Sequence, residues 1–124
     1  MGGVKKLNYE EIPPIAVPGG LLAREAYRGN DFAVFVSSME PGAGESWHTH
    51  LEHVEAVYFT IVGRGRISWR EDGTEHEVIV GPGDLVSIDG GVENQTENVG
   101  TGPWIKVAIH TAGVGTDILR LREK

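Results

Sequence analysis

The feature that most constrains the fold is a series of short apolar segments separated by turns rich in glycine. The chain contains 18 glycines, and no segment shows the periodicity of a helix over ten residues. Evenly spaced short strands with such turns are typical of a β-sandwich or a closed β-barrel. The dipeptide "DG" at 72–73 is the strongest hairpin signal in the chain. Strands are expected at residues 32–39, 46–51, 55–62, 65–70, 75–80, 84–88, 93–98 and 104–110.

Length and composition exclude several classes of protein. A chain of 124 residues suits one domain, and a net charge of −7 argues against binding to nucleic acid, which needs a basic face. The chain has no cysteine, so any metal must be bound by histidine, carboxylate, amide or water. No apolar run is long enough for a signal peptide or a membrane span. We therefore expect a cytoplasmic protein with a small-molecule ligand.

The stretch "GAGESWHTHLEHVEAVYF" at 42–59 concentrates side chains that bind metals. It holds three of the five histidines of the chain. Residues two apart point to the same face of a strand, so His48 and His50 project together and can share one ion. Glu55 follows at an odd spacing, so only a bend near 51–54 would bring it back to the same side. Two imidazoles with a carboxylate suit iron, manganese, nickel, copper or zinc.

This stretch resembles the first motif of the cupin superfamily, which reads G-x5-H-x-H-x3–4-E-x6-G. Gly42 is followed after five residues by His48, and His50 is followed after four residues by Glu55. The closing Gly63 comes after seven further residues, one more than the motif has.

The segment "GDLVSIDGGVENQTEN" resembles the second cupin motif, G-x5-P-x-G-x2-H-x3-N. Gly83, Gly91 and Asn98 meet the motif in both identity and spacing. Asp89 stands in place of the proline, and Asn94 stands in place of the histidine. Two motifs in this order are more specific than either alone. The resemblance implies a small jelly-roll β-barrel, in agreement with the strand pattern.

In the cupin family, the histidines and glutamate of the first motif and the histidine of the second hold one divalent metal ion. By position, the resemblance implies His48, His50, Glu55 and Asn94 as ligands of iron, manganese, nickel or zinc. An amide oxygen is a weaker donor than imidazole toward late transition metals, which favours manganese or iron. In one alternative the first three residues bind the metal, as in non-haem Fe(II) oxygenases, and Asn94 holds substrate or water. In another, His53 replaces the missing histidine.

Strand alternation suggests which side chains meet a substrate inside the barrel. Phe59 and Trp69 are expected on inward rows, and with His53 they are the candidate substrate-binding residues. Tyr58 is expected to point outward, and His110 is expected to be structural or exposed. In the last strand the inward row is expected to be the aliphatic one, made of Ile105, Val107 and Ile109.

The resemblance implies a metal-dependent enzyme that acts on a small polar metabolite, as a dioxygenase, decarboxylase or isomerase. The alternative is a cupin that binds a small molecule without metal and without catalysis. A third hypothesis, a metal-independent isomerase or epimerase, needs a histidine paired with a tyrosine or carboxylate. The catalytic residues and the substrate do not follow from the sequence, because cupins carry out many reactions on one fold.

The first 30 residues differ in character from the remainder of the chain. Prolines in "EEIPPIAVPGG" exclude a helix there, and residues 21–29 form either an extra strand or an extended arm. Small cupins often pair through N-terminal strands, so the resemblance implies a homodimer in which this apolar segment packs on the partner. The expected divisions are an N-terminal arm at 1–30, a cupin barrel at 31–112 and a C-terminal tail at 113–124.

Overall fold

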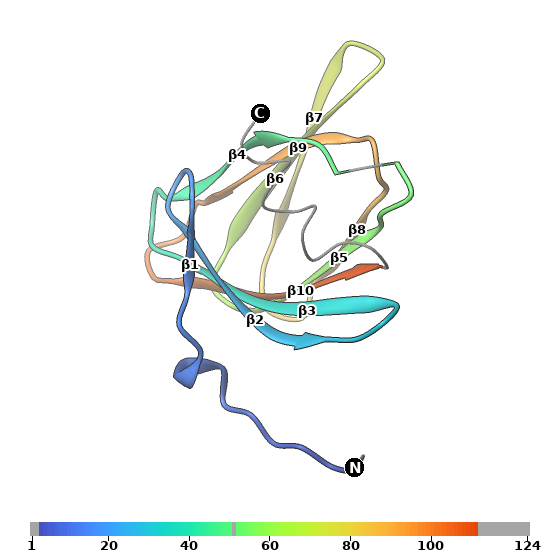
Figure 1. Ribbon diagram of the computed structural model, residues 1–124. Helices are drawn as coiled ribbons and strands as arrows, with labels where there is room; N and C mark the ends of the chain where they lie inside the picture. Colours follow the sequence, from blue (N-terminus) through green and yellow to red (C-terminus); the bar gives the residue numbers. More distant parts are fainter. Residues whose placement is uncertain (1–2, 51, 112–124) are drawn as a thin grey trace.

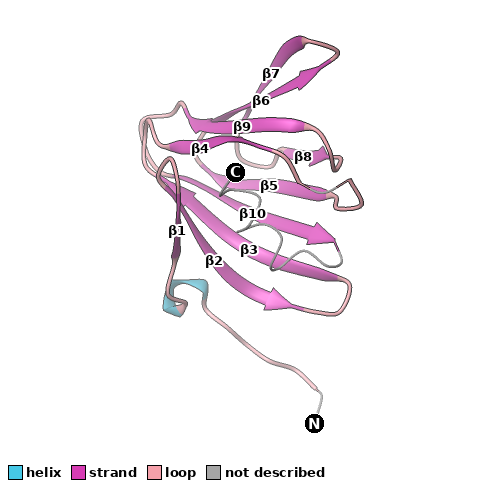
Figure 2. Cartoon of the chain, turned by 45° about the horizontal axis from the view of Figure 1, so that its top comes forward, coloured by secondary structure: helices cyan, strands magenta, loops and turns pink. Residues whose placement is uncertain are grey.

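Two antiparallel sheets face each other and form a jelly-roll barrel in the computed structural model, which describes residues 3–50 and 52–111 (Figures 1 and 2). One sheet has the order β1-β2-β3-β10-β5-β8, and the other has the order β4-β9-β6-β7. The predicted all-β fold is confirmed. The strands of the first sheet are β1 (Ile15–Val17), β2 (Leu21–Arg28), β3 (Phe32–Met39), β5 (Ala56–Val62), β8 (Leu85–Ile88) and β10 (Trp104–Thr111). Those of the second sheet are β4 (Gly44–His48), β6 (Gly65–Glu71), β7 (Thr74–Val80) and β9 (Glu93–Asn98).

Each strand expected from the sequence is present, and β1 and β2 extend the larger sheet. Strand β2 pairs with β3, so the segment at 21–29 is an additional strand. Strand β4 ends at His48, earlier than expected, and His50 therefore lies in the connection to β5. The segment before β1 contains a short 3-10 helix, η1 (Tyr9–Glu11), and otherwise runs away from the barrel (Figure 1). The predicted tail at 113–124 lies outside the described residues.

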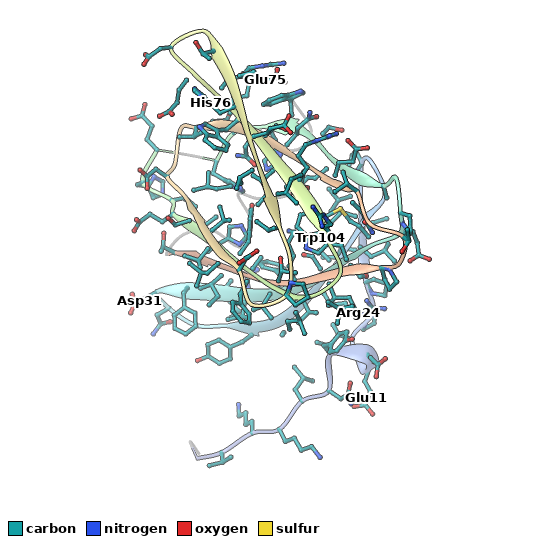
Figure 3. All side chains as sticks on the ribbon, turned by 180° about the vertical axis from the view of Figure 1, so that it is seen from behind. Glu11, Arg24, Asp31, Glu75, His76 and Trp104 are labelled. Carbon is teal, nitrogen blue, oxygen red and sulfur yellow. The ribbon has the colours of Figure 1, made fainter. Side chains whose placement is uncertain are left out.

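The β6–β7 hairpin extends beyond the body of the barrel, with His76 toward its tip (Figures 1 and 3). At its turn, Asp72 has a φ of 51° and Gly73 has a φ of 74°. Two consecutive residues with positive φ are what a two-residue hairpin turn requires. The "DG" prediction is confirmed.

The inward rows of β5 and β10 are not the most apolar ones. In β5 the buried residues are Ala56, Tyr58 and Thr60, whereas Phe59 is 41% exposed on the outer face. The predicted inward direction of Phe59 and outward direction of Tyr58 are therefore wrong. The aliphatic row expected as core in the last strand is also wrong, because the outer face of this sheet is itself rich in aliphatic side chains. The buried row of β10 is Trp104, Lys106, Ala108 and His110.

Trp104 anchors an apolar core between the sheets (Figure 3). Its side chain is fully buried, and its Nε1 donates a hydrogen bond to Thr60 Oγ1 at 3.0 Å. A Cβ at Gly65 would overlap the indole ring, so the glycine allows β6 to pass directly against it. No helix in the described part of the chain is long and apolar enough to cross a membrane.

Candidate functional site

Strand β4 directs two side chains, Glu45 and His48, into the barrel. Strand residues three apart normally face opposite sides, but the pairing of β4 with β9 shifts register between these two. Both are buried as a result. The Nδ1 of His48 lies 2.7 Å from the Ser46 carbonyl oxygen, and its Nε2 lies 3.6 Å from Glu45 Oε2. A hydrogen bond donated from Nδ1 to Ser46 leaves the lone pair on Nε2, which points into the interior.

Three imidazole rings, those of His48, His50 and His110, meet inside the barrel. The ring centroids of His48 and His50 are 5.1 Å apart, and those of His50 and His110 are also 5.1 Å apart. His50 follows β4, whereas His110 comes from β10 of the facing sheet. Within the described structure, His48 Nε2 and both ring nitrogens of His50 and His110 have no hydrogen-bond partner. These buried nitrogens are free to bind a ligand or an ion.

Burial keeps these imidazoles neutral at physiological pH. It lowers the pKa of His48, lowers the pKa of His50 to about 4 and lowers the pKa of His110 to about 3. The positive charge of Lys106 and the neighbouring imidazoles lower the pKa of His50 and His110 further. Neutral imidazole is the form that binds metals and accepts hydrogen bonds.

Lys106 brings an ammonium group into the same interior. Its side chain is 1% exposed, and its Nζ lies 4.1 Å from the ring centroid of Tyr58 and 5.6 Å from that of Trp104. Burial lowers the pKa of Lys106 to about 8, so the ammonium form predominates at neutral pH. Burial also raises the pKa of Tyr58, whose hydroxyl has no hydrogen-bond partner among the described residues.

Asn94 completes the polar wall on the second sheet. It lies opposite His48 of β4 on one side and opposite Trp69 of β6 on the other. Its side chain is fully buried, and its Nδ2 donates a hydrogen bond to the Val92 carbonyl oxygen at 3.0 Å. This bond orients the amide and leaves Oδ1 without a partner in the described structure.

Glu55, predicted as the carboxylate ligand, is exposed and lies outside this buried group. Its backbone N–H donates a hydrogen bond to Thr111 Oγ1 at 2.9 Å. The extra residue in the first motif explains its place: the residue separated from Gly63 by six others, as the motif requires of its glutamate, is Ala56 and not Glu55. Ala56 is fully buried in β5, directly opposite His110 of β10. An imidazole from the neighbouring strand therefore lies beside the position where the motif has its glutamate.

The three candidate substrate-binding residues lie in different places. His53 is exposed in the connection before β5, and Phe59 lies on the outer face. Trp69 is partly buried, stacks on His76 with ring centroids 5.4 Å apart, and donates from Nε1 to Glu71 Oε1 at 3.2 Å.

Trp69 also lines an apolar groove of about 370 Å³ between β6, β7 and β8. The groove lies next to buried polar residues of both sheets. In its lining, Trp69 pairs with Asn94 of the second sheet and Val86 pairs with Tyr58 of the first. Most of its lining is aliphatic, and Glu71 and Asp89 are the carboxylates that line it. The complete lining is Ile67, Trp69, Glu71, Val78, Val86, Ser87, Ile88, Asp89 and Val92.

Sequence reasoning missed Glu45, Lys106 and His110 as members of the site. A usable signal existed for two of them: Lys106, Ala108 and His110 form a row in which two titratable residues flank a small one. Such a row leaves room for a ligand, whereas the alternate row is entirely aliphatic. Glu45 had no such signal, because a register shift that the sequence does not reveal decides its direction.

The histidines of this cluster provide nitrogen donors of a kind that suits a divalent ion. Across residues 3–50 and 52–111, no group of three histidine, cysteine, aspartate or glutamate side chains is arranged to hold a metal ion. With metal–nitrogen bonds of about 2.1 Å, imidazoles that share one ion have ring centres about 5 Å apart. The centroid distances from the His50 ring to the His48 and His110 rings agree with that value.

Comparisons with known proteins agree with this architecture. The chain matches the family model described as the cupin domain over residues 35–110. A search among curated proteins finds no match.

Several solved structures are similar to this one at low sequence identity. An uncharacterized conserved protein with a double-stranded beta-helix domain from Klebsiella pneumoniae is 20% identical with a TM-score of 0.73, covering 90% of this chain and 93% of that chain. KdgF from Halomonas sp. is 14% identical with a TM-score of 0.74, covering 93% and 98%. Oxalate decarboxylase from Bacillus subtilis is 22% identical with a TM-score of 0.71, covering 84% of this chain and 28% of that chain. At these identities the likeness shows the fold.

Proposed function

The chain belongs to the cupin domain family, and we propose that it binds one divalent metal ion inside the barrel and acts on a small polar metabolite. The observation that carries the proposal is the group His48, His50 and His110, in which His48 Nε2 and both ring nitrogens of His50 and His110 are buried without a hydrogen-bond partner in the described structure. Buried polar groups without partners cost free energy, and a bound ion would satisfy them.

The chemistry of these donors supports a transition metal. Three neutral imidazoles suit iron, manganese, nickel or zinc, and Asn94 Oδ1 offers an additional oxygen donor beside His48. Glu45 contributes a buried carboxylate 3.6 Å from His48 Nε2, whereas Glu55 remains at the surface. The ligand set that we propose is therefore His48, His50 and His110, with Asn94 at a fourth position.

A metal in this place would act as a Lewis acid on an oxygen atom of the metabolite. The residues of the chain have separate tasks in this proposal. The hydrogen bond from His48 Nδ1 to the Ser46 carbonyl oxygen fixes the tautomer and direction of the ring. The hydrogen bond from Asn94 to Val92 fixes the amide in the same way. The two sheets exclude bulk water, which strengthens electrostatic interactions with the bound molecule. A dioxygenase, decarboxylase or isomerase is compatible with this arrangement.

Metal analysis of the full chain, purified without an affinity tag or chelator, tests the proposal. We expect near-stoichiometric iron, manganese, nickel or zinc, and loss of that metal in His48→Ala and His110→Ala. Glu55→Ala is the matched control and should retain the metal, because its side chain lies outside the buried group. Absence of metal even after reconstitution would rule the proposal out, and equal metal in the wild type and His110→Ala would exclude His110 as a ligand.

A second candidate function is a metal-free binding protein, and Lys106 is the observation that favours it. Its ammonium group contributes a positive charge at His48, His50 and His110, which opposes the entry of a divalent cation. The same metal analysis separates the two candidates. A protein that stays metal-free but binds small molecules in the barrel would support this second function.

A further inference from the structure

We propose that Lys106 and Tyr58 form an anion subsite beside the histidines, and that the ligand is a small carboxylate with a compact apolar group. This inference specifies the ligand class of the proposed function and rests on its premise that the barrel interior binds a small molecule. Neither residue stands at a position that the cupin motifs specify.

Lys106 holds its ammonium group inside the protein. It is the only lysine or arginine that is buried among the described residues. A lysine normally extends its ammonium group to water, and an ammonium held inside a protein is costly unless an interaction offsets the loss of hydration. The faces of Tyr58 and Trp104 give part of that compensation. A carboxylate would add a charge-assisted hydrogen bond, which is stronger.

The surroundings of Lys106 contain further groups that can bind an anion. Its row on β10 includes His110, and β5 places Thr60 directly opposite it. The ammonium lies over the Tyr58 ring, and the hydroxyl of that ring has no hydrogen-bond partner among residues 3–50 and 52–111. An incoming carboxylate oxygen could accept hydrogen bonds from Lys106 and from this hydroxyl. The anion would also offset the positive charge that opposes a metal at the histidines.

The groove indicates what the remaining part of the ligand looks like. The groove begins beside Tyr58, because Val86 in its lining pairs with that residue. It has a volume of about 370 Å³, and its lining is mainly aliphatic, with Trp69 on one wall. Glu71 and Asp89 in this lining would repel a second negative charge. An alkyl or aryl group fits there better than a phosphate or a second carboxylate. The structure therefore favours a monocarboxylate with an apolar part over a dicarboxylate or a phosphate ester.

Binding of four probes to the metal-free full chain tests this subsite. The probes are phenylacetate, its neutral analogue phenylacetamide, acetate and inorganic phosphate, with affinities from calorimetry and amide chemical shifts of Thr60 and Ala108. We expect phenylacetate to bind about tenfold or more tightly than each of the others, the difference that one charged hydrogen bond or one buried aryl group makes. Equal binding of phenylacetate and phenylacetamide, preference for phosphate, or no saturable binding would overturn the proposal.

Variants of Lys106 show whether this residue binds the carboxylate of the probe. Lys106→Met keeps the length of the side chain and should fold, since it removes a buried charge, and Lys106→Gln is the polar alternative. Both variants should bind phenylacetate about tenfold or more weakly than the wild type does, and their affinity for phenylacetamide should be unchanged. Trp69→Ala should weaken phenylacetate but not acetate. Arg66→Met, at a surface residue paired with Glu97, is the matched control and should bind as the wild type does. Unchanged phenylacetate binding in both Lys106 variants would contradict the assignment.

The outcome can be separated from that of the proposed function. Loss of the anion subsite with normal metal content would overturn this inference and leave the metal proposal standing. Carboxylate binding in a chain that never takes up metal would do the reverse.

Discussion

At the scale of single residues, the interior combines groups that a stable core would avoid. His110 and Lys106 lie in the same row of β10, and His48 and Glu45 face them from the other sheet. Apolar side chains of similar volume would stabilise the barrel more simply. The retention of these groups is understandable if the interior binds a polar molecule, which is the premise of both proposals above.

The histidines predict how the stability of the metal-free protein depends on pH. Burial lowers the pKa of His50 to about 4 and that of His110 to about 3, whereas an unfolded chain has a histidine pKa near 6.5. Between these values the unfolded state binds more protons, so stability is complete above about pH 6.5 and falls on acidification. We expect a loss of a few kcal/mol between pH 7 and pH 4.5. Urea unfolding in the presence of a chelator measures it.

The variant His110→Gln serves as the comparison for this prediction. It removes one group whose protonation opposes folding, so its free energy of unfolding should fall less steeply over the same pH range. Exposed carboxylates are the same in both proteins and cancel in the difference. Identical slopes for the two proteins would show that His110 is not kept neutral by the fold.

The sequence predicted the position of some of these residues correctly and of others wrongly, for physical reasons. His48, His50 and Asn94, the residues that the motif spacing singles out, all lie in the buried group, and their role as ligands stays a prediction. Tyr58 and Phe59 were assigned to the wrong faces, because both rows of β5 are apolar enough to be core. Which row faces inward depends on the second sheet, and a single strand contains no information about that. Glu55 illustrates a related limit, since one inserted residue moved it from the predicted inner position to the surface.

At the scale of elements, the strands themselves were predictable. Glycine-rich turns mark their ends, and a turn such as Asp72–Gly73 requires backbone conformations that few other residues adopt. Strand β4 is the exception, because it ends early and shifts register against β9. The start of β4 is held by a contact distant in sequence: the Gly44 N–H donates to the Gly19 carbonyl oxygen at 2.8 Å, which ties the β1–β2 turn to this strand.

Two glycines near β4 provide a prediction about how this element is held. A Cβ at Gly44 would overlap the Thr96 carbonyl oxygen of β9. This oxygen belongs to the backbone, so it cannot move aside by a change of side-chain rotamer. Gly44→Ala should therefore destabilise the protein by about 3 kcal/mol and disturb His48, the last residue of the strand. Gly42→Ala is the matched control, because that residue has a φ of 84° and open space around it. It should cost only about 1 kcal/mol from backbone strain.

Urea unfolding of the two variants, with metal content as the second measurement, checks this prediction. We expect Gly42→Ala to retain the metal and Gly44→Ala to lose much of it. Equal destabilisation by the two substitutions would mean that close packing against β9 is not what positions β4.

At the scale of the whole molecule, the outer face of the six-stranded sheet is unusually apolar for a free surface. The register aligns Val36, Val107, Phe59 and Leu85 across four neighbouring strands. Phe59 is 41% exposed and Leu85 is 62% exposed. A continuous apolar surface of this kind is typical of a protein–protein contact. The homodimer expected from the sequence therefore has a candidate interface that the sequence did not reveal.

We expect a charge in the middle of this face to dissociate the dimer. Phe59→Glu places a carboxylate among aliphatic side chains of both subunits, and a symmetric contact would contain it twice, once from each subunit. Light scattering during size-exclusion chromatography should change from about twice the 13.4 kDa chain mass to the mass of one chain. Ile79→Glu is the matched control, because Ile79 is 41% exposed on β7 of the other sheet, and it should leave the mass unchanged. A wild-type protein with the mass of one chain at micromolar concentration would contradict the homodimer. A dimer that survives Phe59→Glu would place the interface elsewhere. The N-terminal segment before β1 would then be the next region to truncate.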